Sequence, residues 1–156
     1  MSQPARDSGY TLIEVLVTIV LMGAMMAIAV AGYDRWAAAS EQSGTAREIQ
    51  SLMRQAQQRA VTEGRAMCVK FTSSPARYTL YRGACDDTAK TKVNGPFQVN
   101  GSRVGIGSPS FTDSTGGVTF FARGTASPGS VTVTRQGSSK VYTLEVEGLT
   151  GRVSLD

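Results

Sequence analysis

The longest uncharged stretch in this chain of 156 residues runs from Val15 to Tyr33. Together with Leu12–Glu14 it forms a mainly apolar segment of about 22 residues, which is roughly 33 Å of α-helix. The hydrocarbon core of a bilayer is about 30 Å thick, so the segment is long enough to span a membrane. Its single charge is Glu14. A carboxylate inside a membrane span is costly unless it is paired, which makes Glu14 a candidate functional residue.

Two interpretations of this apolar segment compete. In the first, it is a secretory signal peptide with Arg6 as its charged start and Ala29-Val30-Ala31 as the cleavage site before Gly32. In the second, it is a membrane helix that the protein retains. The pattern after residue 33 favours the second interpretation, because a helical period continues there.

This helical period places apolar residues at spacings of three and four, so that they line one face. The face comprises Ile49, Leu52, Met53, Ala56, Ala60 and Val61. No proline interrupts residues 42–63, and Gly64 is suited to end a helix. We therefore expect one helix from about Tyr10 to Glu63, apolar on all sides in its first half and amphipathic in its second.

After Gly64 the apolar residues alternate with polar ones, which is the period of strands that have one solvated face. The alternating runs begin near Met67, Tyr78, Val118, Val131, Tyr142 and Val153, and turn residues such as Gly, Pro and Asn separate them. The pattern predicts a meandering antiparallel sheet whose apolar face the amphipathic helix covers, which is an α+β fold. The least patterned stretch, from Asp86 to Asp113, is expected to form long loops.

The composition argues against an enzyme. The chain contains no histidine, which excludes Ser-His-Asp and Cys-His catalysis and histidine-ligated zinc. Two cysteines without C-x-x-C spacing do not make a redox motif. Asp86-Asp87 is an acidic pair without further carboxylates nearby, so a calcium site is not expected either. No catalytic residue, metal or cofactor is predicted.

Cys68 and Cys85 can be interpreted in two ways. If the part of the chain after the membrane helix lies outside the cytoplasm, a disulfide between them is permitted. It would close a loop of about 17 residues and stabilise the fold by about 3 kcal/mol. The alternative is two buried free thiols, because unpaired cysteine is often buried.

The start of the chain resembles a known signal. Gly9-Tyr10-Thr11-Leu12-Ile13-Glu14, followed by the apolar run, is similar to the class III signal of type IV prepilins and type II secretion pseudopilins. The resemblance implies that a membrane prepilin peptidase cleaves between Gly9 and Tyr10 and that the new N-terminus, Tyr10, is methylated. It also implies that Glu14 pairs with the terminal amine of a neighbouring subunit in a filament.

Three later segments narrow the resemblance. Residues 52–65, Phe121–Ala126 and Thr150–Val153 are similar to stretches of H-type pseudopilins and FimT/FimU-type minor pilins. The implied fold is pilin-like, with a long N-terminal helix packed on an antiparallel sheet. The implied organisation is a leader at 1–9, an assembly helix at 10–33 spanning the inner membrane, an amphipathic helix at 34–64 and a periplasmic β-rich domain at 65–156. The implied function is that of a minor subunit that joins or primes a type IV pilus or a secretion pseudopilus with other pilin subunits.

Small residues recur every four positions in the apolar segment, at Gly23, Ala27 and Ala31. This stripe would let neighbouring helices approach closely during assembly. A generic alanine-rich membrane helix carries the same spacing, so both interpretations stay open.

The excess of basic residues lies in the middle of the chain. Residues 47–103 carry ten bases and four acids, whereas residues 104–156 carry four of each. The excess is consistent with a solvated basic surface or with a DNA receptor on a pilus. Some DNA-binding relatives end in G-R-x-R, but Gly151-Arg152-Val153-Ser154 lacks the second arginine. The candidate nucleic-acid contacts are Arg65, Lys70, Arg77, Arg82, Lys90, Lys92 and Arg152.

Overall fold

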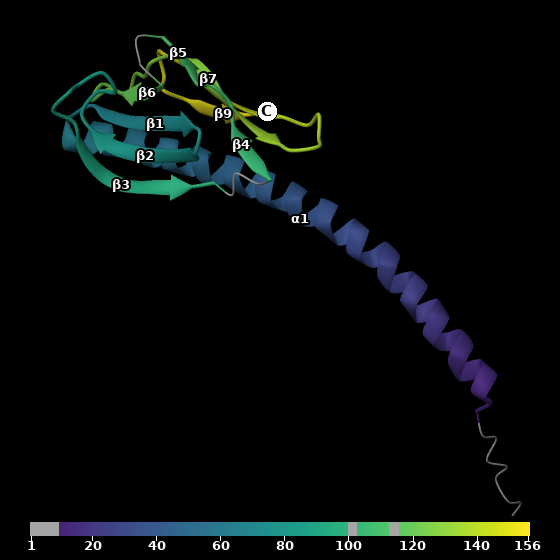
Figure 1. Cartoon of the computed structure of the whole chain (residues 1–156). Coiled ribbons are helices and arrows are strands. Elements are labelled where there is room, and N and C mark those ends of the chain that lie inside the picture. Colours follow the sequence, from purple (N-terminus) through teal and green to yellow (C-terminus); the bar gives the residue numbers. More distant parts are fainter. Residues whose placement is uncertain (1–9, 100–102, 113–115) are drawn as a thin grey trace, which may run out of the picture. The chain divides into compact units, whose positions relative to one another are not determined.

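The computed structural model describes residues 10–99, 103–112 and 116–156 (Figure 1). These residues form one helix, α1 (Leu12–Glu63), and nine strands. The strands are β1 (Met67–Ser73), β2 (Ala76–Arg82), β3 (Thr91–Gln98), β4 (Val104–Ile106), β5 (Ser110–Phe111), β6 (Gly117–Phe120), β7 (Gly129–Arg135), β8 (Tyr142–Val146) and β9 (Val153–Leu155). The chain divides into two compact units, Met1–Ala37 and Ala38–Asp156, which we call the anchor unit and the globular unit.

The single long helix predicted from the sequence is confirmed. It begins at Leu12 and ends at Glu63, close to the expected bounds. Gly64 follows with a φ of +63°, a left-handed conformation that favours glycine. The N–H of Arg65 donates to the carbonyl of Ala60 at 3.2 Å, which is the bond expected of a Schellman cap. Gly64 therefore ends the helix as predicted.

The expectation of one meandering sheet is wrong, because the strands form two antiparallel sheets. The first has the order β3-β2-β1-β6, and the second has the order β4-β7-β8-β9 with β5 also paired to β7. The cause is that β6 returns to pair with β1, while β4 pairs with β7 in the second sheet. A period of two shows that a segment is a strand, but it does not show which strand lies beside it.

The long loops expected between Asp86 and Asp113 are also wrong, since β3, β4 and β5 lie there. Asn94-Gly95-Pro96 has the composition of a turn between strands, yet these residues lie within β3. β3 is an edge strand, where proline is tolerated because its missing N–H need not face a partner. The pairing of β2 with β3 also shifts register between Tyr78 and Tyr81. Such shifts interrupt the alternation of apolar and polar residues by which a strand is recognised in a sequence.

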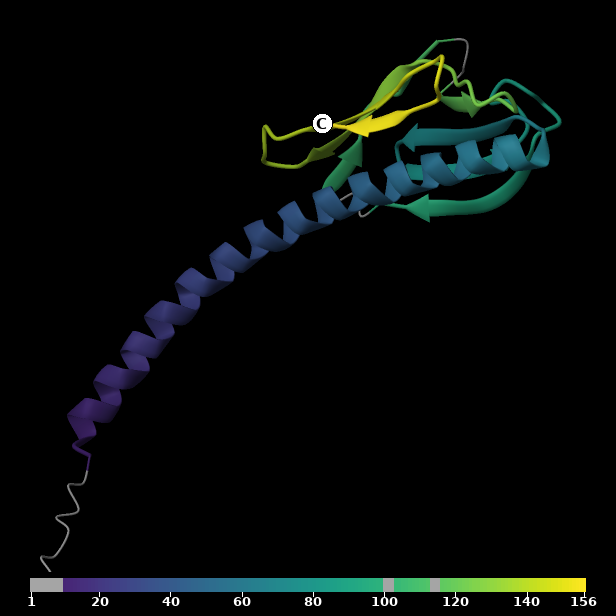
Figure 2. The same cartoon turned by 180° about the vertical axis from the view of Figure 1, so that it is seen from behind.

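The second half of α1 packs its apolar face on the strands, and Figure 2 shows it running along one side of β1, β2 and β3. Ile49, Met53, Ala56 and Ala60 are fully buried, as predicted. The placement of Val61 on this face is wrong, since its side chain is 52% exposed. Val61 lies about 100° around the helix from Ala60, which takes the last position on the buried face.

A buried amide ties α1 to the second sheet. Gln42 is buried, and its Nε2 donates to the carbonyls of Val133 at 3.0 Å and Lys140 at 2.8 Å. Both N–H groups of the amide are thus satisfied, which removes the cost of burying it. α1 therefore contacts both sheets, β1–β3 through its apolar face and β7 through Gln42.

We expect Tyr78 to make the stability of the globular unit depend on pH. Burial, together with a hydrogen bond and the charge of Glu48, raises the pKa of Tyr78 well above its ordinary 10.0. The neutral folded side chain then contributes stability below pH 10 that is lost as the pH rises through and beyond that value. We expect the free energy of unfolding to fall between about pH 10 and pH 12, by up to about 1.4 kcal/mol per pH unit from this group. Denaturant titrations should show a shallower fall in Tyr78→Phe, and an unchanged slope would contradict this assignment.

Candidate functional site

The start of α1 is fixed by a local cap that the sequence analysis missed. The N–H of Glu14 donates to Oγ1 of Thr11 at 3.3 Å and to the carbonyl of Thr11 at 3.1 Å. Thr11 is therefore the N-cap, and Glu14 stands at the third helical position, the Thr-x-x-Glu order of a capping box. A carboxylate in the first turn is also favoured by the helix dipole. The spacing of these two residues could have revealed the cap.

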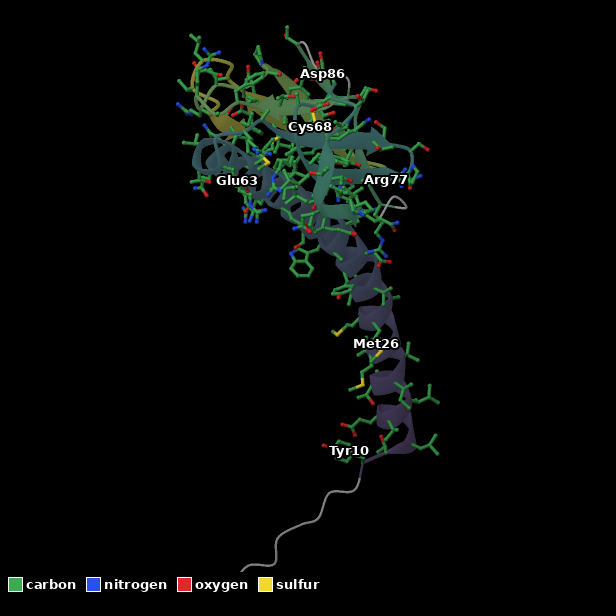
Figure 3. All side chains as sticks on the ribbon, turned by 90° about the vertical axis from the view of Figure 1, so that its left-hand side faces the viewer. Tyr10, Met26, Glu63, Cys68, Arg77 and Asp86 are labelled. Carbon is green, nitrogen blue, oxygen red and sulfur yellow. A yellow bond between two sulfur atoms is a disulfide. The ribbon has the colours of Figure 1, made fainter. Side chains whose placement is uncertain are left out.

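The anchor unit leaves its apolar side chains uncovered. The large apolar side chains from Leu12 to Val30 are between 47% and 82% exposed. Figure 3 shows them standing out from the ribbon between the labelled Tyr10 and Met26. Among the described residues, α1 is the one helix long and apolar enough to cross a membrane. An apolar surface of this extent is covered in a working protein, by lipid or by other helices.

Two aromatic rings mark the far end of the apolar run. Tyr33 and Trp36 lie 6.1 Å apart between ring centroids, and both are exposed. Asp34 and Arg35 lie between them in the sequence. Tyrosine and tryptophan are enriched where a membrane meets water, because their rings are apolar and their tips are polar. The position of this pair at the end of the apolar run is a signal that the sequence also contains.

No contact among the described residues requires small side chains at Gly23 and Ala27 of the stripe. A Cβ added at Gly23 would meet no other atom within 4 Å, and Ala27 is exposed. The side chain of Ala31 and the predicted cleavage residue Gly9 lie outside the described residues. Any requirement for small side chains at Gly23 and Ala27 therefore comes from another molecule.

The two cysteines form a disulfide, so the alternative of free thiols is wrong. Cys68 of β1 is bonded to Cys85, with 5.0 Å between their Cα atoms. The N–H of Cys85 also donates to Oγ1 of Thr119 in β6 at 3.0 Å. The bridge thus holds the segment after β2 against β1 and β6.

The basic residues proposed to contact nucleic acid do not gather on one surface. Lys70, Arg77 and Lys92 line a hollow of about 350 Å³ on the face of β1–β3 that is turned away from α1; we call it the basic hollow. Its other lining residues are Thr72, Thr79, Tyr81 and Pro96. Lys90 lies beside it, with Nζ 6.0 Å from the centroid of the Tyr81 ring.

The remaining three basic candidates lie elsewhere. Arg82 forms an ion pair with Glu63 at 2.8 Å, and Arg65 follows the end of α1. Arg152 lies next to β9, where it shares a shallow hollow with Arg54 and Gln57 of α1. A single nucleic-acid surface built from all seven residues is therefore not formed within the globular unit.

Two segments that resemble stretches of the pilin family, Phe121–Ala126 and Thr150–Val153, meet at α1. Nε2 of Gln57 donates to the carbonyl of Thr150 at 2.9 Å and lies 3.5 Å from the carbonyl of Gly124. Gly151 has a φ of +63°, and a Cβ there would lie 2.5 Å from the oxygen of Gly124 and 2.7 Å from Nε2 of Gln57. The segments at residues 121–126 and 150–153 therefore join two loops to the helix, and glycine is required at their closest approach.

We predict that Gly151→Ala lowers the free energy of unfolding by about 3 kcal/mol, from backbone strain plus crowding. Gly137→Ala is the matched control, because Gly137 also has a positive φ of +72° but has no atom within 4 Å of an added Cβ. The control should lose only about 1–2 kcal/mol. Denaturant unfolding of the full chain in detergent measures both, and equal losses would show that the junction tolerates a methyl group.

The described residues, 10–99, 103–112 and 116–156, contain no group of three or more His, Cys, Asp or Glu side chains that could hold a metal. What the arrangement offers is an exposed apolar helix with a carboxylate in its first turn. The globular unit rests on the second half of the same helix. This arrangement suits insertion into a membrane and assembly with other helices.

Two family descriptions match the sequence. "Type II transport protein GspH" matches residues 45–150, and "Prokaryotic N-terminal methylation motif" matches residues 4–30. No curated protein matches the chain closely enough to count as a relative.

Solved structures share the fold. The minor pseudopilin EpsH from the type II secretion system of Vibrio cholerae is similar with a TM-score of 0.61 at 11% identity, over 74% of this chain and 96% of that one. The type IV minor pilin FimU of Pseudomonas aeruginosa is similar with a TM-score of 0.59 at 16% identity, over 75% and 89%. GspH of E. coli gives a TM-score of 0.55 at 16% identity, over 75% and 88%.

These proteins are structural subunits and not enzymes, which agrees with the expectation from the composition. The pilin-like fold predicted from the sequence is confirmed by the helix, the two sheets and these similarities. The family match covers residues 45–150, well over half of the sequence. The chain therefore belongs to the GspH family of type II transport proteins.

Proposed function

We propose that this protein is a minor pilin-type subunit that joins or primes a type IV pilus or a type II secretion pseudopilus. It would be made as a precursor, cut by a prepilin peptidase between Gly9 and Tyr10, and methylated at Tyr10. The single observation that carries the proposal is the uncovered apolar half of α1 with Glu14 in its first turn. Among the described residues, the helical part of the core comes from the second half of α1, which leaves the first half for lipid or for neighbours.

Before assembly, residues 10–33 would span the inner membrane. Arg6 in the leader favours a cytoplasmic N-terminus, because positive residues are retained on that side. Tyr33 and Trp36 would then lie near the opposite surface, at the end of the apolar run. The globular unit would be periplasmic, and the Cys68–Cys85 disulfide suits that oxidising compartment.

In the filament, the apolar halves of neighbouring helices would cover one another. Glu14 would then lie among apolar side chains, where an unpaired carboxylate is very unfavourable. Cleavage after Gly9 would create an ammonium group at Tyr10, and that group on a neighbouring subunit would pair with Glu14. Such a pair adds little net stability, but it specifies the register of one subunit on the next. The open surface at Gly23 and Ala27 would allow close helix contact.

The proposal is tested by expressing the chain with a prepilin peptidase and a complete filament machinery. We expect the mature chain in the sheared filament fraction, in small amount relative to the bulk subunit. A chain that stays in the membrane as the full precursor, or that is released as a soluble protein beginning at Gly32, would contradict it. The second result would instead support the conventional signal peptide with cleavage after Ala31.

A further inference from the structure

We propose that the basic hollow binds protein carboxylates, supplied by an extended acidic segment of a neighbouring, different filament subunit. The segment would carry carboxylates at every second residue. This inference rests on the proposed function, because assembly in a filament supplies the neighbour.

The charges in the basic hollow are unbalanced. Lys70, Arg77 and Lys92 come from β1, β2 and β3, and no acidic residue is among the described side chains that line the hollow. No hydrogen bond or ion pair joins these three side chains to another described residue, whereas Arg82 pairs with Glu63. Figure 3 shows Arg77 at one edge of the globular unit. Like charges gathered without an acid repel one another, and a bound anion relieves that repulsion.

The register of the strands sets the spacing of the backbone positions that carry Lys70 and Arg77. Lys70 is opposite Thr79 and Thr72 is opposite Arg77, so Lys70 and Arg77 are diagonal neighbours on one face. Diagonal neighbours of this kind are about 7–8 Å apart. Alternate residues of an extended strand are about 7 Å apart, so carboxylates at such positions match the spacing of the two backbone positions, and the long side chains of Lys70 and Arg77 can reach them. The hydroxyls of Thr72, Thr79 and Tyr81 add hydrogen-bond donors to the same hollow.

The same features favour a short acidic protein segment over a nucleic acid. Proteins that hold duplex DNA firmly neutralise on the order of six to ten phosphates, more than three lining cations can reach. Single strands are held by bases stacked on open aromatic faces. The aromatic residue of the hollow is Tyr81, and the ammonium of Lys90 already lies over its ring, 6.0 Å from the centroid.

A second copy of this chain fits less well than a different subunit. Its own alternate carboxylates are Glu145 and Glu147, which share a hollow with Arg152. Oε2 of Glu147 also accepts a hydrogen bond from Oγ1 of Thr150 at 2.8 Å. Glu147 thus already has a donor, and Arg152 lines the same hollow as both glutamates, so this pair is a poor ligand for the basic hollow.

The test uses the full chain in detergent micelles and a fluorescent peptide of alternating glutamate and threonine as the probe. Arg77→Glu with Lys92→Glu should weaken peptide binding roughly tenfold, and binding to the wild type should weaken as salt is added. Arg47→Glu with Arg54→Glu is the matched control. It makes the same change in net charge on exposed positions of α1 and should bind within about twofold of wild type. Lys92→Gln, an exposed change on edge strand β3, should give a smaller loss without risk to the fold.

The proposal would be overturned if the peptide did not bind, or if Arg77→Glu with Lys92→Glu (the hollow variant) bound it as tightly as the wild type. It would also be overturned if Arg47→Glu with Arg54→Glu lost as much binding as the hollow variant. An oligonucleotide with the same charge as the peptide should bind more weakly than the peptide. If it bound more tightly, and if the hollow variant lost that binding, the ligand of the basic hollow would be phosphate and not carboxylate. In cells, the hollow variant should be cut after Gly9 and inserted like the wild type but be depleted from filaments. A wild-type chain that is not processed would instead refute the proposed function, independently of the hollow.

Discussion

Gly9→Val is expected to leave the chain as an uncut precursor. A peptidase that cuts between Gly9 and Tyr10 must bring its catalytic groups close to the backbone, and glycine offers no side chain in the way. A barrier raised by about 2.7 kcal/mol slows cleavage roughly a hundredfold, which is enough to leave almost no mature chain. Pulse labelling followed by gel electrophoresis measures the fraction of precursor directly.

The control for Gly9→Val changes the competing cleavage site. Ala29→Leu with Ala31→Leu removes the small residues required by a conventional signal peptidase while keeping the segment apolar. This variant should be processed like the wild type. The opposite pattern, with Gly9→Val processed and the Ala29/Ala31 variant uncut, would identify a conventional signal peptide.

Glu14→Gln is expected to be processed normally but to fail in assembly. In the proposed filament, loss of the carboxylate would leave the ammonium of Tyr10 in the neighbouring subunit without its partner among apolar side chains. Breaking one side of a buried pair costs about 3–5 kcal/mol, so the filament-bound fraction should fall by a hundredfold or more. Glutamine also serves at the third position of a capping box, so the start of α1 is preserved while the charge is removed.

Thr11→Ala supplies the complementary control. It removes the N-cap that holds the first turn, at a cost of about 1 kcal/mol, but it keeps the carboxylate of Glu14. This variant should assemble at close to the wild-type level in sheared filament fractions. If Thr11→Ala failed and Glu14→Gln assembled, the role of Glu14 would be to start the helix and not to pair with a neighbour.

The parts of the fold that could be predicted are those set by local periodicity. Spacings of three and four identified the buried face at Ile49, Met53 and Ala56, and Gly64 marked the end of α1. The number of sheets could not be predicted, because strand pairing depends on contacts far apart in the sequence. β3 was missed for a local reason, since Pro96 is compatible with a strand only at a sheet edge.

The candidate site also has parts that the sequence shows and parts that depend on contacts between distant residues. The apolar run and Glu14 were visible in the sequence, and so was the capping order of Thr11 and Glu14, although it was overlooked. The role of Gln42 could not be predicted from the sequence, because the carbonyls that it binds lie 91 and 98 residues further along the chain. The basic residues looked like one group, yet strand order collects only Lys70, Arg77 and Lys92 in the basic hollow.

The most direct test of the whole account is the mass of the N-terminal peptide of the protein isolated from its native membrane or filament. The account predicts a peptide that begins at Tyr10 and carries one added methyl group on its amine. A peptide that begins at Met1 or at Gly32 would contradict it, because neither end provides the amine that Glu14 is proposed to meet.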